Sequence, residues 1–453
     1  MRLQKKNVAG RKADTAAPSL RPFPSWRASC LHGLVALAIP AAMAGMAAPA
    51  HAQSAPEPPQ TMSPQDTQRG VTVRSRPRPD YDPAGVRLSG FRLDGAVEAG
   101  VGYDDNVQPG TGEDVEDGFF AQTVNVSANS FWTRHALGLT ASQSSRQHFS
   151  NSNQNWNDFS VGIAGRYDIG RASSLRASYT HTRSHLEVDN FDVQAGGLNE
   201  PIPYDSDIFL VGGTAAFNRL ALTGTAEYRT IRYENSDVNG VRVFNNVNDY
   251  DTILGEVQAA YSIVEGREIL TLVRLQDINY QQSGQSGRDS FTWEVQAGIN
   301  YDLTGLWQAR LLAGYRERTY DSPTLKTLSG PAFEGQLTYL PTQLTTATLA
   351  VSRTIEESIR ASNVSYTRTQ GRLTVDHELL RNVIVTGELR AEHRDYPQQG
   401  NVTDGIVLVG AQWLLNRNMS VLASYQHTER LSAPDGAREY GINQFQVRLR
   451  FAL

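Results

Sequence analysis

Apolar and polar residues alternate one by one along most of the chain, and the alternation is clearest between residues 291 and 315. That stretch reads FTWEVQAGINYDLTGLWQARLLAGY. One side of its first arm carries apolar residues: Phe291, Trp293, Val295, Ala297, Ile299 and Tyr301. A two-residue period is that of a β-strand, whose successive side chains point to opposite faces. The second arm, from Trp307 to Tyr315, repeats the pattern with one interruption at Leu312, and the DLTG between the arms has the composition of a turn. The stretch therefore predicts a β-hairpin.

The length of the first arm suits a strand that crosses a membrane. Ten steps lead from Phe291 to Tyr301, which is roughly 33 Å of strand at about 3.3 Å per residue. Tilted by about 40°, such a strand rises roughly 25 Å, the height of the apolar band of an outer-membrane barrel. Tyr301 and Trp307 flank the turn, where the interfacial aromatic girdle of such a barrel would lie.

The same alternation recurs from Leu88 to Leu453 in 18 segments. Eight short turns join these segments in pairs, at 132–134, 168–173, 218–219, 264–267, 302–305, 341–342, 380–382 and 416–418. Longer polar connections lie between the pairs, such as 104–118, 187–203, 235–246 and 431–438. Short turns at one end and long loops at the other are typical of outer-membrane barrels, with the turns in the periplasm. We therefore predict an all-β fold over residues 88–453, a transmembrane, antiparallel, up-and-down β-barrel of about 18 strands with both termini periplasmic.

A soluble all-β domain or a β-propeller is the competing architecture. A propeller repeats every 40 to 50 residues or so, which resembles the spacing of the turns. Each blade needs four short strands, whereas each interval of this chain holds two long ones. A helical membrane protein is excluded, because no run of about 18 apolar residues follows the N-terminal region.

The register of the strands assigns charged residues to the barrel interior. In the segment 383–394, Val385 and Leu389 share one side, while Glu388 and Arg390 share the other. An arginine facing lipid near the midplane would cost roughly 2 to 4 kcal/mol, so the charged side is expected to face the lumen. The predicted pore-lining residues are Glu227, Arg229, Glu294, Arg310, Arg316, Glu388, Arg390, Glu392, Arg394, Arg448 and Arg450. Such groups would bind hydroxyl-rich or anionic chains through weak, repeated sites. Alternatively, they are ion-paired struts that stiffen the wall.

The first 87 residues differ from the rest of the chain. Residues 1–52 read as a signal peptide, with seven basic residues, an Ala-rich apolar segment at 31–48 and a small-x-small cleavage site at 50–52. A transmembrane anchor is the weaker alternative, because a proline and a glycine interrupt the apolar segment. Residues 53–87 are rich in proline and poor in apolar residues, which predicts a disordered periplasmic linker. Its end, RPRPDYDPAGVRL at 76–88, is distinctive enough to suggest a role beyond that of a flexible spacer, which remains the alternative.

Charge and cysteine content narrow the possible partners. Without the leader, the chain keeps 35 basic and 46 acidic residues, a net charge of −11. An acidic chain argues against nucleic acid as a partner. Cys30, the single cysteine, lies in the predicted leader, so no disulfide framework is expected.

Candidate chemistry is sparse. Asp376-His377 and Glu392-His393 pair a carboxylate with a histidine, but adjacent residues of a strand point to opposite faces. Neither pair is a ready catalytic dyad, and we expect the protein not to be an enzyme. The acidic runs at 113–117 and 248–251 could bind Ca²⁺ through oxygen ligands, but a solvated loop explains them as well. We expect no cofactor and no metal.

Five stretches carry a resemblance to a known family. They are the segment 76–88, YDDNV at 103–107, PT at 341–342 with LTT at 344–346, DHELLRN at 376–382 and LLNRN at 414–418. With them, the mature chain resembles, over nearly its whole length, the beta-barrel porin type 2 family of outer-membrane proteins. The resemblance implies an integral barrel of the Gram-negative outer membrane that accompanies exopolysaccharide synthesis and secretion systems and serves as the exit for the polymer.

The expected function is therefore passage of exopolysaccharide or a related polymer across the outer membrane. The implied partners are outer-membrane lipid, the polysaccharide or a small hydrophilic solute, and a periplasmic polysaccharide-export protein. A general diffusion porin for small hydrophilic solutes is the alternative. A plugged siderophore-type receptor is disfavoured, because only 35 residues separate the predicted leader from the barrel.

Overall fold

The computed structural model describes residues 71–453 except positions 171, 239–240, 304, 361–362 and 435–436. The predicted signal peptide and most of the predicted linker, residues 1–70, lie outside the described residues. The described chain forms one sheet of 19 strands and a separate two-stranded hairpin. Strand β1 (Val86–Leu88) has three residues, and the other 18 strands of the sheet have 12 to 18 residues each.

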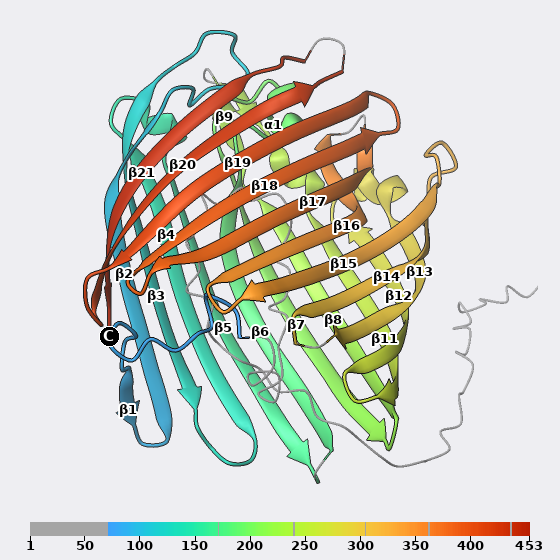
Figure 1. Cartoon of the computed structure of the whole chain (residues 1–453). Helices are drawn as coiled ribbons and strands as arrows, with labels where there is room; N and C mark the ends of the chain where they lie inside the picture. The colour runs from blue at the N-terminus through green and yellow to red at the C-terminus, as the bar shows by residue number, and fades with distance from the viewer. Residues whose placement is uncertain (1–70, 171, 239–240, 304, 361–362, 435–436) are drawn as a thin grey trace, which may run out of the picture. The chain divides into compact units, whose positions relative to one another are not determined.

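These 18 long strands close into a barrel. They are β2 (Phe91–Asp104), β3 (Asp117–Ser130), β4 (Ala136–His148), β5 (Trp156–Ile169), β6 (Ser173–Leu186), β7 (Ile202–Phe217), β8 (Leu220–Tyr233), β11 (Tyr250–Val264), β12 (Arg267–Tyr280), β13 (Ser290–Leu303), β14 (Trp307–Tyr320), β15 (Leu328–Thr342), β16 (Thr345–Arg360), β17 (Asn363–Leu380), β18 (Val383–Tyr396), β19 (Gly400–Leu414), β20 (Met419–Ser432) and β21 (Gly441–Ala452). Each long strand pairs antiparallel with the long strands before and after it (Figure 1). The first, β2, also pairs with the last, β21. The predicted up-and-down barrel of 18 strands is confirmed.

The two ends of the described chain meet on β2. Strand β21 covers most of one edge of β2, and Leu453 donates its N–H to the carbonyl oxygen of Gly95 at 2.9 Å. Strand β1 pairs with the remaining part of the same edge. The carbonyl oxygen of Leu453 accepts the N–H of Gly85 at 3.3 Å, so β1 follows directly on the C-terminus along β2.

Eight short connections lie at one end of the barrel, which we call the inner end. They are 131–135, 170–172, 218–219, 265–266, 304–306, 343–344, 381–382 and 415–418. All eight predicted turns correspond to them, but the turn predicted at 341–342 lies two residues further on. The reason is that β15 continues through Pro341, next to a bulge between Tyr339 and Thr342 where a strand tolerates proline. Short turns of outer-membrane barrels face the periplasm.

The nine connections at the opposite, outer end are mostly longer. They are 105–116, 149–155, 187–201, 234–249, 281–289, 321–327, 361–362, 397–399 and 433–440. They contain the helix α1 (Phe191–Ala195), the hairpin of β9 (Ser236–Val238) and β10 (Val241–Val243), and the 3-10 helices η2 (Ser152–Gln154), η3 (Asn245–Asn248) and η4 (Ser283–Arg288). The connections 361–362 and 397–399 are as short as inner turns. At 361–362 the flanking strands β16 and β17 are among the longest, so the wall itself extends further there.

Side chains alternate between the two faces of the wall as the sequence predicts. On β13, Phe291 and Val295 are exposed, whereas Glu294 and Gln296 are buried. On β21, Phe445 and Val447 are likewise exposed. The outer surface is therefore apolar and the inner surface polar. In the part of the chain that the structure describes, no helix has the length and apolar character needed to cross a membrane.

One inward patch departs from this pattern. Leu312, which interrupts the alternation of the second hairpin arm, packs with Ala260, Leu270 and Leu272 from β11 and β12. These positions lie on the same face as the charged residues of their strands, as the two-residue period requires. The interior therefore carries an apolar cluster beside its charged groups.

Candidate functional site in the barrel interior

A first cluster of charges centres on Glu294 of β13. Its carboxylate pairs with Arg316 of β14 and lies 3.1 Å from Nη1 of Arg274 on β12. Arg274 also pairs with Glu256 of β11 at 2.7 Å and with Glu334 of β15 at 3.7 Å. Arg274 and Glu294 are direct cross-strand neighbours, as are Glu294 and Arg316, which is the geometry in which opposite charges stabilise a sheet. Alternating charges thus connect five adjacent strands.

A second cluster connects β17 to β20. Glu392 of β18 pairs with Arg368 of β17 at 2.8 Å and with Arg394 of its own strand at 2.5 Å. Arg394 and Arg430 of β20 share Asp404 of β19, at 3.5 and 2.9 Å. Arg368 also pairs with Glu356 of β16 at 2.9 Å, so three carboxylates here serve three guanidinium groups and the charges of the cluster balance.

A third cluster lies where the barrel closes. Glu98 of β2 pairs with Arg448 at 3.0 Å and with Arg450 at 2.6 Å, both on β21. Glu98 is only 2% exposed, and it lies directly opposite Arg450 in the sheet. This carboxylate therefore connects the first and last long strands.

The remaining predicted residues form smaller pairs on the same face. Glu227 and Arg229 of β8 pair at 2.8 Å, and Arg310 lies 3.7 Å from Glu334. Glu388 and Arg390 of β18 pair at 2.6 Å.

All eleven predicted pore-lining residues thus face inward, and each has an ion-pair partner. The ion pairs fit the expectation of struts in the wall, and a pore-lining role stays a prediction. Sequence reasoning missed Glu98, Arg274, Arg368 and Asp404 as partners. The signal was available, because each occupies an inward position of its own strand.

The loop 187–201, which carries α1, crosses the outer mouth. Asn190 caps α1 by accepting the N–H of Asp192 at 2.8 Å. Phe191 then packs against Tyr366, Tyr396 and Val402, and its ring centroid lies 5.0 Å from that of Tyr396. We call this segment the mouth loop.

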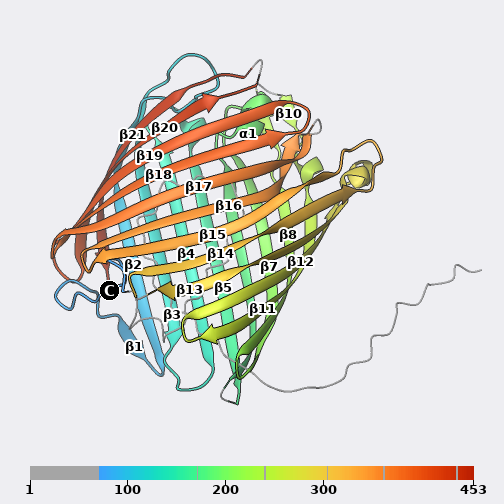
Figure 2. The same cartoon turned by 45° about the vertical axis from the view of Figure 1, so that its right-hand side comes forward.

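The contacts of the mouth loop lie on the far side of the barrel. The loop leaves β6 and returns to β7, whereas Tyr366 and Tyr396 belong to β17 and β18. Seven long strands separate β7 from β17, and seven separate β6 from β18 in the other direction. The loop therefore spans the barrel, in agreement with the place of α1 in Figures 1 and 2.

Polar contacts hold the mouth loop on the same side. Arg430 donates to the carbonyl oxygen of Asp189 at 2.7 Å and to Oε1 of Gln194 at 2.5 Å. Tyr440 donates its hydroxyl to the same carbonyl oxygen at 2.9 Å. The carboxyl group of Asp192 is buried, and this burial raises its pKa above the usual value, although hydrogen bonds and nearby arginines oppose the shift.

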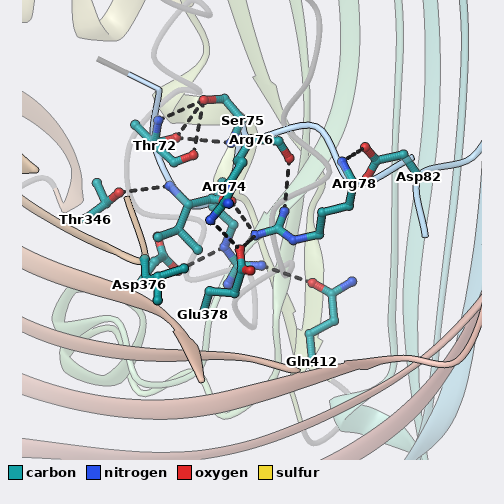
Figure 3. Close-up of polar contacts among 12 residues, drawn as sticks. Thr72, Arg74, Ser75, Arg76, Arg78, Asp82, Thr346, Asp376, Glu378 and Gln412 are labelled. Carbon is teal, nitrogen blue, oxygen red and sulfur yellow. Dashed lines mark hydrogen bonds and ion pairs between the residues drawn. The ribbon is translucent and has the colours of Figure 1, made fainter. Parts of the chain in front are cut away.

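A second segment, residues 71–82, lies against the wall at the inner end, and we call it the inner strap (Figure 3). Val73 is fully buried and donates its N–H to Oγ1 of Thr346 at 2.9 Å. Arg74 pairs with Asp376 at 2.9 Å and donates to Oε1 of Gln412 at 3.1 Å.

Two further arginines of the inner strap share one carboxylate. Arg76 and Arg78 lie 3.5 and 2.8 Å from Glu378. Arg78 also donates to the carbonyl oxygen of Val73 at 2.8 Å, which folds the strap back on itself.

Residues 71–87 thus differ from the predicted disordered linker. The arginines of the inner strap occupy every second position, 74, 76 and 78, and the carboxylates of β17 also lie two positions apart, at 376 and 378. The spacing of the positive charges on the strap therefore matches that of the negative charges on the wall.

The two carboxylate–histidine pairs point apart as expected. Asp376 accepts hydrogen bonds from Arg74 and Thr386, whereas Nδ1 of His377 lies 2.9 Å from Oγ1 of Thr345. Glu392 pairs with arginines, whereas Nδ1 of His393 lies 2.9 Å from Oγ1 of Thr403. The acidic runs have local partners as well. Asp114 accepts from Asn106 at 3.0 Å, and Asp251 accepts from Tyr228 at 2.9 Å.

A closed barrel with an apolar outer surface and ion-paired charges inside defines the class of outer-membrane channel proteins. The chain belongs to the family described as "Putative beta-barrel porin 2", whose model matches residues 78–453. The family resemblance found in the sequence is thereby confirmed, and the protein is one of the bacterial outer membrane.

No curated protein matches the chain. Similar solved structures include OccAB2 from Acinetobacter baumannii, with 10% identity and a TM-score of 0.44 over 80% of this chain and 97% of that one. OccK9 (OpdG) from Pseudomonas aeruginosa has 11% identity and a TM-score of 0.43 over 80% and 98%. The siderophore receptor PirA from A. baumannii has 7% identity and a TM-score of 0.43 over 81% of each chain.

Proposed function

We propose that this barrel passes exopolysaccharide, or a related hydroxyl-rich polymer, across the outer membrane. The observation that carries the proposal is the inward network of ion-paired arginines and carboxylates, which spans β11 to β15 and β17 to β20. A guanidinium has five N–H donors and keeps some of them after pairing with one carboxylate. Sugar hydroxyls can use those donors and the remaining carboxylate lone pairs.

A nearly balanced set of charges suits a polymer that must keep moving. Conduction needs binding that is weak and repeated, because a single tight site would trap the chain. Each arginine is already paired with a carboxylate, which neutralises most of its charge. Each new contact between the guanidinium group and a hydroxyl group is therefore weak. The sequence resemblance to barrels beside exopolysaccharide secretion systems supports the same cargo. A periplasmic polysaccharide-export protein would then deliver the polymer at the inner end.

A general diffusion porin for small hydrophilic solutes is the second candidate. The mouth loop favours it, because a loop that reaches from β6 and β7 to β17 and β18 divides the outer opening into smaller passages. Small solutes would pass such openings without displacement of the loop, whereas a polymer of large cross-section would require it to move.

Two measurements separate the candidates. Deleting the gene and assaying surface polysaccharide tests export, and loss of the polysaccharide with restoration by the intact gene supports the proposal. Swelling of liposomes that contain the purified barrel tests diffusion with sugars of graded size. Free passage of small sugars, together with unchanged surface polysaccharide in the deletion strain, would overturn polymer export and favour the porin.

A further inference from the structure

We propose that the inner strap is a gate, held against the inner end of the wall by its arginines and able to leave it while the barrel stays intact. This inference does not depend on the cargo, because it concerns the opening through which any cargo or ion would pass.

The contacts of the inner strap gather at one level of the barrel. Thr346 is the second residue of β16, Glu378 lies two residues before the end of β17, and Gln412 lies two before the end of β19. All three therefore lie next to the short turns of the inner end. Figure 3 shows the strap arginines directed toward these wall residues.

The C-terminal end of the inner strap is attached to a different part of the wall from the one that its arginines contact. After residue 82 the chain continues into β1, which pairs with β2. Two long strands, β20 and β21, separate β2 from β19, and five separate it from β16. The segment from Val73 to β1 therefore connects separate parts of the inner rim and occupies space at the opening between them.

The inner strap can separate from the wall because side-chain contacts, and no main-chain ladder, hold it there. A wall strand is held by a continuous ladder, for example 14 residue pairs between β13 and β14. Residues 71–85 form no such ladder, and Pro77, Pro79 and Pro83 have no N–H to donate to one. The side chains of Arg74 and Arg76 are 24% and 27% exposed, so solvent ions can compete for their carboxylates.

Charge matching explains both closure and release. Three guanidinium groups of the inner strap meet two wall carboxylates, Asp376 and Glu378. The buried side chain of Val73 adds one apolar anchor. Among the described contacts of residues 71–82 with the wall, loss of the arginine contacts leaves that anchor and the Thr346 hydrogen bond, so we expect the strap to swing away about β1.

Conductance of single barrels in planar lipid bilayers tests the gate. The full chain with Arg74→Gln, Arg76→Gln and Arg78→Gln should conduct several-fold more than the unmodified chain. The matched control carries Arg134→Gln, Arg219→Gln and Arg417→Gln, which remove the same charge from exposed sites in turns of the inner end, away from the strap and β1. Equal conductance of the strap variant and the unmodified chain, or an equal increase in the control, would overturn the proposal.

A cysteine pair provides an independent test that leaves the charges in place. Val73→Cys with Thr346→Cys, in a Cys30→Ser background, joins the inner strap to the wall where the two residues are in hydrogen-bond contact. Oxidation should hold the barrel in its low-conductance state, and a reductant should restore openings, with neither effect in the single-cysteine variants. Gel mobility before and after heating verifies folding, and mass analysis verifies the cross-link. If a verified cross-link leaves openings unchanged, the strap is no gate, whatever the result for polysaccharide export.

Discussion

Substitution of Glu98 tests whether its ion pairs with the last strand stabilise the closed barrel. Its carboxylate is 2% exposed and pairs with both Arg448 and Arg450 of the last strand. Glu98→Gln keeps the size of the side chain and removes its negative charge. The two guanidinium groups of β21 then have an amide oxygen in place of the carboxylate of β2.

The expected loss follows from the general cost of breaking a buried ion pair. Removing one partner of such a pair destabilises a protein by about 3 to 5 kcal/mol, because the other charge stays buried without compensation. We expect the lower part of this range for Glu98→Gln, since the glutamine oxygen still accepts one hydrogen bond. Urea unfolding of the barrel in lipid vesicles, followed by tryptophan fluorescence, measures the change in the free energy of unfolding.

Two further variants separate the seam from charge loss in general. Glu227→Gln breaks the pair with Arg229, which lies within one strand and does not connect β2 to β21, so we expect a smaller loss. Adding Arg448→Gln to Glu98→Gln removes one of the two positive charges that Glu98 pairs with in the unmodified chain and should recover part of the stability. If Glu98→Gln unfolds at the same urea concentration as the unmodified chain, or costs no more than Glu227→Gln, the account of the seam is refuted.

Four other outcomes are expected. Gly298→Ala should lower the urea midpoint because its Cβ would lie 1.8 Å from a main-chain oxygen of the neighbouring strand, whereas Gly387→Ala, with no atom within 4 Å of its Cβ, should not. Leu389→Arg places a charge on an outward position that is 53% exposed, and unfolding from lipid should become easier by about 2 to 4 kcal/mol. Phe191→Ala removes a buried aromatic ring, which costs about 3 to 5 kcal/mol, and should increase hydrogen exchange in the mouth loop. Burial raises the pKa of the Asp192 carboxyl, so docking of the mouth loop should be strongest below the pKa that this carboxyl has in the unfolded chain and should weaken as the pH rises through the raised pKa. Hydrogen exchange in the mouth loop, measured at a series of pH values, should show this trend. The Asp192→Asn variant should not show it.

The barrel could be predicted from the sequence because its main determinant is local. The two-residue period at Phe291 to Tyr301 identifies both the strand and the face of each side chain. Lipid excludes charge, so the same period assigns Glu294 and Arg316 to the interior without knowledge of any contact. Turn composition then places the inner end, with an error of two residues only where Pro341 continues a strand through a bulge.

The partners of those charges could not be predicted, because they depend on contacts between distant parts of the chain. Glu98 and Arg450 are 352 positions apart, and their pairing follows from closure and register together. The mouth loop was visible only as a polar connection, since its docking on Tyr396 depends on the diameter of the barrel. The inner strap had a signal in its alternating arginines, but proline content favoured disorder, and the matching carboxylates lie about 300 positions away.

Both inward segments are held by the same part of the wall. The mouth loop contacts β17 and β18 through Tyr366 and Tyr396 at the outer end, and the inner strap contacts β17 through Asp376 and Glu378 at the inner end. β17 has 18 residues, more than any other described strand, so one continuous element supports both. Two constrictions at opposite ends of one lumen act in series, and the narrower one limits the current. Opening the strap alone therefore raises the conductance only until the mouth loop becomes the limit. Combined release of both segments, by the strap substitutions together with Phe191→Ala, should raise conductance by more than the sum of the separate increases.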